Sequence, residues 1–313
     1  MHTVRFELTP FQTETFALNL IGNNRRLLKD LVENGSCDLS YSLSDKARFR
    51  VNIFTQKGYF TTVLRKLETD VPSIEGMQFP EAFGKMAADL NGLILFTGAT
   101  GTGKTTSLAA LLNRINQERS VHVVTLEDPI EYELAGVGQT QVNAKIDLTF
   151  AKALRAILRQ DPDIIMIGEI RDFETAQIAI QASMTGHLVL ATLHTNDAVS
   201  AVTRLTDMGI EPFLLSSSLL GVLAQRLVRK VCTACQGRGC AMCGQTGYAG
   251  RTGIFELMIT DDALRAQIHA KQSEASLRDG ALAGGMVLMR EDGERLVQLG
   301  ITRPEELLRV TRD

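Results

Sequence analysis

The sequence of 313 residues predicts an α/β fold in which a mostly parallel sheet carries helices on both faces, preceded by a small α/β N-terminal domain. Two observations predict the larger part. Apolar runs of strand length alternate with segments of helical periodicity from residue 92 onward, and a glycine-rich loop joins the first of these strands to its helix. A third observation predicts the smaller part, because two segments with alternating polar and apolar residues lie before a turn-rich stretch at 68–80.

The composition argues against several classes of protein. The formal net charge is −3 and the pI is about 6.0, so no generally basic surface for nucleic acid is indicated. The N-terminal residues lack the apolar core of a secretory signal, and the longest apolar stretch, 213–224, is too short to span a bilayer. Five cysteines, four of them clustered, favour a metal site in a reducing compartment. We therefore expect a cytoplasmic protein with no nucleic-acid partner.

The smaller domain is expected over residues 1–75. Alternation of polar and apolar residues predicts a hairpin and one further strand, and helical spacing of apolar residues predicts a helix. These elements are a strand at 4–8, a helix at 19–33, and hairpin strands at 48–54 and 61–67. The turn-rich stretch at 68–80 is expected to be the linker, and Cys37 to be a small, partly buried structural side chain.

The larger domain is expected over residues 76–313. Its strands are short apolar runs of the kind found in sheets that are buried on both faces. These runs are 93–97, 121–126, 164–167 and 188–192. One helix follows the glycine-rich loop, and two more are expected at 150–159 and 173–183. Strands that alternate with helices at this spacing indicate a parallel sheet, in which functional sites lie at the carboxyl ends of the strands.

The glycine-rich loop fits the phosphate-loop pattern of a glycine, four residues, and then Gly-Lys-Thr. Its residues are Gly98, Ala99, Thr100, Gly101, Thr102, Gly103, Lys104, Thr105 and Thr106. The glycines let main-chain N–H groups surround a phosphate, Lys104 brings a cation to the β- and γ-phosphates, and the Thr105 hydroxyl is a ligand for Mg²⁺. A dinucleotide-binding loop is the nearest alternative, but Lys104 and Thr105 at the start of the helix argue against it. The loop therefore predicts a site for a nucleoside triphosphate.

A cluster of carboxylates ends the second strand of the larger domain, in Glu127-Asp128-Pro129-Ile130-Glu131. Carboxylates this close together suit a bound cation or a proton transfer. A general base for water attacking the γ-phosphate must be a carboxylate near that phosphate, and we assign Glu131 first and Glu127 second. An exposed acidic loop is the alternative interpretation.

The ends of the next two strands also carry polar residues. Glu169 follows the third strand, and an acid at a strand tip is the pattern that coordinates Mg²⁺, usually through water. Arg171 and Asp172 could equally be a surface ion pair. His187 and His194 frame the fourth strand, and they are either structural side chains or sensors of the γ-phosphate.

Four clustered cysteines form two Cys-x-x-Cys pairs that are separated by four residues. They are Cys232, Cys235, Cys240 and Cys243. Four thiolates complete the tetrahedral shell of a structural Zn²⁺ and leave no open position for catalysis. We expect a zinc element over 231–248, with an iron–sulfur cluster or a redox dithiol as the alternatives.

These motifs, in this order and at this spacing, resemble those of the hexameric ATPases of type II secretion and type IV pilus assembly. The phosphate loop, aspartate box, acidic strand end and histidine box of that family are similar to residues 98–106, 127–131, 168–172 and 185–194. The resemblance covers residues 47–313. It implies a RecA-like ATPase domain with ATP and Mg²⁺ as cofactors.

The resemblance also implies roles for single residues and a mode of assembly. The residues concerned are Glu131 as catalytic base, Glu169 at the acidic strand end, His187 and His194 in the histidine box, and Arg50 and Arg65 as arginines of the N-terminal domain that complete the site. The family further implies a homo-hexamer that acts on an inner-membrane platform protein of a pilus or secretion system. The membrane association would then be peripheral and would run through that partner.

The branches of the family are distinguished by features outside the site. The tetracysteine element, residues 247–256 and residues 285–311 are similar to the secretion and pilus-extension branch, whereas the hairpin at 48–67 is closer to retraction members. The segment ahead of Arg48 is shorter than is usual in the family, which leaves the docking mode open. We predict a motor that hydrolyses ATP to drive type II secretion or type IV pilus assembly.

Three alternatives to that function remain. The first is a pilus-retraction ATPase. The second is a nucleic-acid-translocating RecA-like motor, which would use the basic helical face of Lys152, Arg155 and Arg159. The third is a regulatory subunit that binds ATP without hydrolysing it.

Overall fold

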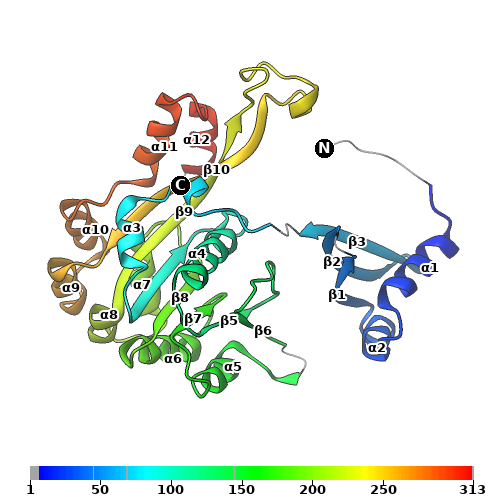
Figure 1. Cartoon of the computed structure of the whole chain (residues 1–313), viewed down its shortest axis with the longest axis horizontal. Helices are drawn as coiled ribbons and strands as arrows, with labels where there is room; N and C mark the ends of the chain where they lie inside the picture. The colour runs from blue at the N-terminus through cyan, green and yellow to red at the C-terminus, as the bar shows by residue number, and fades with distance from the viewer. Residues whose placement is uncertain (1–6, 45, 68–69, 144–145, 312–313) are drawn as a thin grey trace. The chain divides into compact units, whose positions relative to one another are not determined.

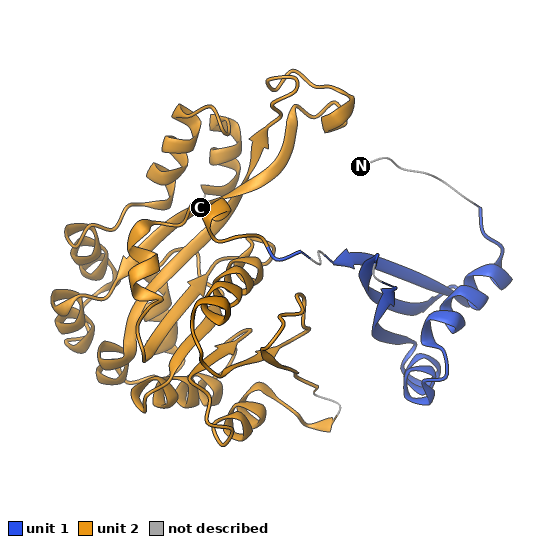
Figure 2. Ribbon diagram, in the orientation of Figure 1, with its two compact units in different colours: residues 1–71 blue, residues 72–313 orange. Residues whose placement is uncertain are grey.

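The computed structural model describes residues 7–44, 46–67, 70–143 and 146–311 (Figure 1). The chain divides into two compact units, residues 1–71 (unit 1) and residues 72–313 (unit 2), as Figure 2 shows. The boundary falls within the turn-rich stretch at 68–80. Each unit has a sheet and a hydrophobic core of its own.

Unit 1 is a three-stranded antiparallel sheet packed against two helices. Its elements are α1 (Pro10–Ile21), α2 (Arg25–Asn34), β1 (Ser36–Leu43), β2 (Ala47–Gln56) and β3 (Tyr59–Leu67). Helix α1 packs against β3, and α2 packs against β1. The fully buried side chains between them include Leu31, Cys37, Val51 and Ile53. The expected hairpin is confirmed as β2 and β3, with positive φ angles at Lys57 and Gly58 in its turn.

Other expectations for unit 1 differ from the structure. The single helix expected at 19–33 is two helices, because Gly22 ends α1 with a φ of 58° and the Asn24 side chain caps the start of α2. Strand β1 was not expected, although its inward residues alternate. Of the strand expected at 4–8, residues 4–6 lie outside the described residues and residues 7 and 8 lie in no strand.

Unit 2 is built on a seven-stranded sheet in the order β10-β9-β4-β8-β7-β5-β6. Its strands are β4 (Gly92–Thr97), β5 (Val123–Glu127), β6 (Gly138–Gln141), β7 (Ile164–Ile167), β8 (Leu188–Leu193), β9 (Leu219–Val231) and β10 (Tyr248–Ile259). All neighbouring strands run parallel except β10, which is antiparallel to β9. The predicted mostly parallel sheet is therefore confirmed.

Helices surround this sheet (Figure 1). They are α3 (Glu81–Met86), α4 (Lys104–Glu118), α5 (Phe150–Ile157), α6 (Phe173–Met184), α7 (Ser200–Asp207), α8 (Pro212–Ser218), α9 (Asp262–His269), α10 (Glu274–Ala283), α11 (Met289–Gln298) and α12 (Pro304–Thr311). Two short 3-10 helices are η1 (Glu75–Met77) and η3 (Ala241–Cys243). The helices expected at 150–159 and 173–183 are confirmed as α5 and α6.

The interior strand β4, which lies between β9 and β8, is buried on both faces, as its continuous apolar sequence predicts. Leu93 and Leu95 point into a large core that includes α6, whereas Phe96 packs edge-on against Phe83 of α3, with ring centroids 5.6 Å apart. Successive side chains of a strand point to opposite faces, so helices cover both sides of the sheet here.

Strands β6, β9 and β10 were not expected from the sequence. The apolar stretch 213–224 is divided between α8 and the first half of β9, so it is neither one helix nor one strand. Strand β6 is a short polar edge strand, and such a strand carries little apolar signal. Among the described residues, no helix combines the length and the apolar character needed to cross a membrane.

Candidate nucleotide site and metal centre

The phosphate loop connects β4 to α4, at the carboxyl end of β4. Its backbone needs glycine: φ is 145° at Gly98, 81° at Gly101 and 93° at Gly103. Space is also restricted at Gly98, where a Cβ would lie 2.6 Å from both the Gln225 carbonyl oxygen and the Thr102 hydroxyl. The first turn of α4 follows directly, and this leaves main-chain N–H groups available to an anion.

The side chain of Lys104 lies folded against this loop. It is 8% exposed, and its Nζ donates to the carbonyl oxygens of Gly98 at 2.6 Å and Ala99 at 3.0 Å. Burial lowers the pKa of Lys104 to about 8, with nearby Arg226 lowering it further and Glu169 opposing the change. The ammonium group, the Glu169 carboxylate and the Arg226 guanidinium therefore share one region of the molecule.

The carboxyl ends of β5 and β7, which are both followed by acidic residues, lie side by side because the two strands are paired neighbours. Arg171 connects them: its Nε donates to Glu169 Oε2 at 2.7 Å, and its Nη1 lies 3.7 Å from Asp128 Oδ2. Asp172 does not pair with Arg171 in this way but caps α6 by accepting a hydrogen bond from the N–H of Thr175. Glu169 is also in contact with His194, whose Nε2 is 3.0 Å from Glu169 Oε1.

The acidic segment after β5 is held against the same edge of the sheet. Glu127 is 5% exposed, and burial raises its pKa although it accepts hydrogen bonds from Thr125 and Gln139. The main chain of Glu131 favours the ionised form of Glu127 and so lowers its pKa, whereas the Glu131 carboxylate raises that pKa. Tyr132 places its hydroxyl 3.2 Å from the hydroxyl of Thr106 in the first turn of α4. Glu131 therefore belongs to a segment that contacts the phosphate-loop helix.

The structure separates the two histidines that frame β8. His194 follows the carboxyl end of the strand and joins the acidic group, whereas His187 precedes its amino end. The main-chain carbonyl of His187 accepts a hydrogen bond from the N–H of Gly92, the first residue of β4. The imidazole Nδ1 of His187 lies 2.9 Å from the carbonyl oxygen of Ala182. At about 3.3 Å per residue, the two histidines lie roughly 23 Å apart. Within one chain, His187 therefore lies at the end of β8 that is away from the acidic group.

Arg50 and Arg65 belong to unit 1. They are register partners on β2 and β3, and both side chains are exposed. Partners in an antiparallel pair project to the same face, so the two guanidinium groups form one small basic surface on this hairpin.

Strand β9 also contributes to the site, which was not predicted from the sequence. Gln225 and Arg226 follow Ala224, which is the register partner of Thr97 at the end of β4. The buried Gln225 amide accepts a hydrogen bond from Ser107 at 2.7 Å, and Arg226 donates to the carbonyl oxygen of Asn196 at 2.9 Å. Polar residues directly after an apolar run were the available signal, as they were for Glu169.

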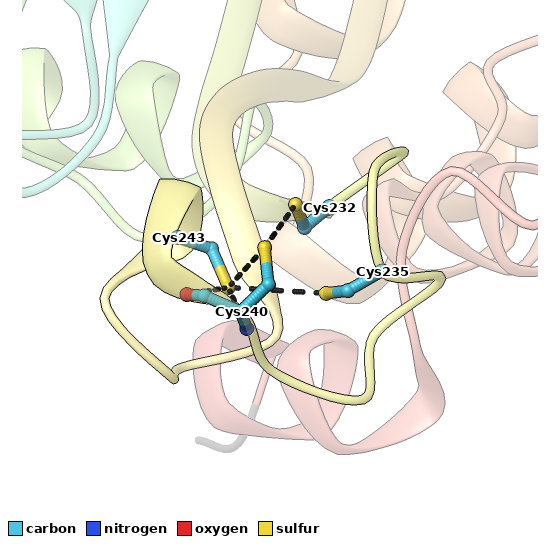
Figure 3. Close-up of side chains that lie close together, drawn as sticks. All are labelled: Cys232, Cys235, Cys240 and Cys243. Carbon is cyan, nitrogen blue, oxygen red and sulfur yellow. Dashed lines mark hydrogen bonds between the residues drawn. The ribbon is translucent and has the colours of Figure 1, made fainter.

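The four clustered cysteines lie in the segment that connects β9 to β10 (Figure 3). All four sulfur atoms lie within 4.8 Å of one another, and Sγ–Sγ distances are 3.9 Å for Cys232–Cys240, 3.9 Å for Cys235–Cys243 and 3.7 Å for Cys240–Cys243. A tetrahedral zinc with Zn–S bonds of about 2.3 Å requires sulfur atoms about 3.8 Å apart. The donor set and its spacing therefore fit Zn²⁺.

Main-chain groups around the cluster favour the thiolate form. The N–H of Gly239 donates to Cys235 Sγ at 3.2 Å, and the N–H groups of Cys240 and Gly247 donate to Cys243 Sγ at 3.2 and 3.3 Å. Hydrogen bonds from N–H groups stabilise negative charge on sulfur, which is the form that binds a metal.

A glycine loop between a central parallel strand and its helix, faced by acids from neighbouring strand tips, defines a phosphate-loop nucleotide-binding protein. The chain belongs to the family described as type II/IV secretion system protein, whose family model matches residues 29–309. The predicted membership of the type II secretion and type IV pilus assembly family is confirmed.

Among its relatives, type II secretion system protein HxcR of Pseudomonas aeruginosa is 64% identical over 231 residues, which cover 71% of this chain and 49% of HxcR. The type IV pilus assembly ATPase PilB of Thermus thermophilus is 46% identical over 276 residues, covering 78% of this chain and 31% of PilB. The chain thus spans at most about half the length of these relatives. The crystal structure of the pilus retraction motor PilT with bound ADP superposes with a TM-score of 0.81 at 33% identity, covering 96% of this chain and 84% of PilT.

Proposed function

We propose that this chain carries the ATP-hydrolysing core of a motor that drives type II protein secretion or type IV pilus assembly. The observation that supports this most directly is the convergence of Lys104, the segment carrying Glu131, and Glu169 at one edge of the sheet. Hydrolysis needs a phosphate-binding cation, a base and an acid for Mg²⁺ close together, and these three provide them.

The residues of the loop, Gly98 to Thr106, hold the phosphates in this proposal. Thr105 and Glu169 hold Mg²⁺, which neutralises charge on the β- and γ-phosphates. Glu131 accepts a proton from the water that attacks the γ-phosphorus in line, while the bond from that phosphorus to the bridging oxygen breaks. Lys104 neutralises the charge that develops on the nucleoside diphosphate as it leaves.

His194 orients the carboxylate of Glu169 in this arrangement, and we give no such role to His187 within the same chain. Arg50 and Arg65 stabilise the transition state in the assembled particle, which we propose to be a homo-hexamer. The motor acts at the cytoplasmic face of the inner membrane on a platform protein of the pilus or secretion system. The four cysteines hold one structural Zn²⁺. The zinc orders the segment that connects β9 to β10, and this segment provides a surface for a partner.

Several observations bear on the alternatives. The similarity to PilT favours pilus retraction as the second candidate, whereas the higher identity to HxcR and the tetracysteine element favour secretion or assembly. The basic face considered for a nucleic-acid motor is partly neutralised, since Lys152 forms an ion pair with Asp147 and Arg155 with Glu174.

Turnover of the Glu131→Gln variant tests this proposal. The variant should retain ATP affinity and lose about 10²- to 10⁴-fold in kcat, because it keeps the shape of the site and removes the base. Near wild-type turnover would remove Glu131 from the mechanism. Phosphate release by the wild-type chain excludes a subunit that only binds ATP. Indifference of that activity to added DNA or RNA would support the secretion motor over the nucleic-acid motor. Ring formation with a non-hydrolysable ATP analogue would support a motor over a subunit that only binds ATP.

A further inference from the structure

Gln139 on the edge strand β6 makes three hydrogen bonds to the last residue of β5 and to the acidic segment that follows it. Its Nε2 donates to Glu127 Oε1 at 2.9 Å and to the carbonyl oxygen of Tyr132 at 2.8 Å. Its Oε1 accepts from the N–H of Leu134 at 2.8 Å. Both N–H bonds of the amide are thus used, and each partner lies in or beside the segment that carries Glu131.

The strand pairing explains how one side chain reaches all three partners. Gln139 is the register partner of Thr125, so its side chain lies on the same face of the sheet as those of Thr125 and Glu127. The segment 128–134 leaves β5 and returns toward β6 across this face. Gln139 thus meets the buried carboxylate at the start of the segment and the main chain near its end.

Further contacts fix other parts of the same segment. Gln141, two residues along β6, accepts a longer hydrogen bond of 3.4 Å from the N–H of Ile130. The Tyr132 hydroxyl contacts Thr106 in α4, and the Asn116 side chain near the end of α4 donates to the carbonyl oxygen of Ala135 at 2.7 Å. Glu131 therefore sits between two points that are tied to β6, in a segment whose far side is tied to α4.

We propose that Gln139 is a positioning residue for the catalytic base, holding the segment around Glu131 so that its carboxylate faces the γ-phosphate. This inference rests on the proposed function, in which Glu131 is that base. Only an amide fits the three bonds, because it offers two donors to oxygen atoms and one acceptor to an N–H. A glutamate has the same shape but presents no donor at neutral pH and adds a negative charge beside buried Glu127.

Two variants test the proposal, with ATP turnover and ATP affinity measured separately. Gln139→Met keeps the length of the side chain and removes all three bonds, and Gln139→Glu keeps its shape and reverses its hydrogen bonding. We expect kcat to fall about 10- to 100-fold in Gln139→Met and further in Gln139→Glu, because the base is misplaced. ATP affinity should stay within about threefold of wild type, because Lys104 and the phosphate loop are untouched.

A matched control is Gln117→Glu, the same substitution at an exposed position on α4, where the Gln117 side chain donates a hydrogen bond to Asn113. It should leave turnover unchanged. Hydrogen exchange gives a readout that does not depend on activity: amides of 128–135 should exchange faster in both Gln139 variants and not in the control.

Three outcomes would overturn the positioning role. They are unchanged kcat, unchanged exchange over 128–135, or an equal loss of kcat and ATP affinity together with a lower Tm. If the wild-type chain does not hydrolyse ATP at all, the proposed function fails instead, and exchange over 128–135 still reports whether Gln139 holds the segment.

Discussion

His194 and Glu169 are joined by a 3.0 Å contact between the imidazole Nε2 and the carboxylate Oε1, across the neighbouring tips of β8 and β7. Arg171 holds the other carboxylate oxygen of Glu169 at 2.7 Å. The acid proposed to hold Mg²⁺ is therefore oriented from both sides, and one of those sides is a histidine that the sequence could not distinguish from His187.

Replacing each histidine with alanine should separate their roles. We expect His194→Ala to lower kcat by about 10- to 100-fold, because Glu169 loses one of the two groups that orient it. His187→Ala removes a side chain at the opposite end of β8 and should change kcat of the isolated chain by less than about threefold. Steady-state ATPase assays measure both. Equal losses in the two variants would contradict the assignment of His194 alone to this site.

The affinity for ATP should depend on pH through Lys104, whose pKa burial lowers to about 8. A bound triphosphate favours the charged form, so binding is strongest below pH 8 and weakens as pH rises through that value. We expect Kd to rise about tenfold between pH 7 and pH 9. Titration with a fluorescent ATP analogue measures this. A flat profile would show that Lys104 stays charged over this range, and Lys104→Ala, which should abolish tight binding, is the reference variant.

Purified protein should contain about one zinc per chain, released when the thiols are modified. Cys235→Ser should lose the metal, whereas Cys37→Ala should keep it because Cys37 lies in the core of unit 1. Elemental analysis also distinguishes zinc from iron. A folded, metal-free protein with four reduced thiols would contradict the structural zinc site.

Glu306 on α12 should stabilise the folded state of unit 2 at neutral pH and lose this effect in acid. It is 2% exposed and bonded to Arg229 and Arg309, and the hydrogen bond from Arg229 is the main cause that lowers its pKa to about 2. Because the folded pKa lies below the unfolded value of about 4.5, this stabilisation is complete above pH 4.5 and is lost as pH falls toward 2. Glu306→Gln should therefore destabilise the protein by about 2 kcal/mol at pH 7 and by less at pH 4.

Urea denaturation at the two pH values measures this difference. The matched control is Glu305→Gln, the same change at the exposed neighbouring position on α12. It should have little effect at either pH. An equal effect of both substitutions would show that the ion pairs of Glu306 contribute nothing specific.

The amino-acid sequence by itself determined the elements whose chemistry is local. The phosphate loop, the buried strands β4, β7 and β8, and the tetracysteine set each follow from residue types at short spacing, because glycine conformations, apolar runs and thiolate ligands act within a few residues. The same holds for the acids at the tips of β5 and β7. Each of these strand tips shows an abrupt change from apolar to charged residues.

Only the tertiary structure decided which of these pieces meet. The sheet order places Gln225 and Arg226 beside the phosphate loop, although more than a hundred residues of sequence separate them from it. It also places Gln139, on a polar edge strand, in contact with the segment that carries Glu131. It also brings His194, and not His187, into contact with Glu169. Contacts between distant segments depend on strand order and register. Strand order and register are fixed by the burial of the whole sheet and not by any local sequence pattern.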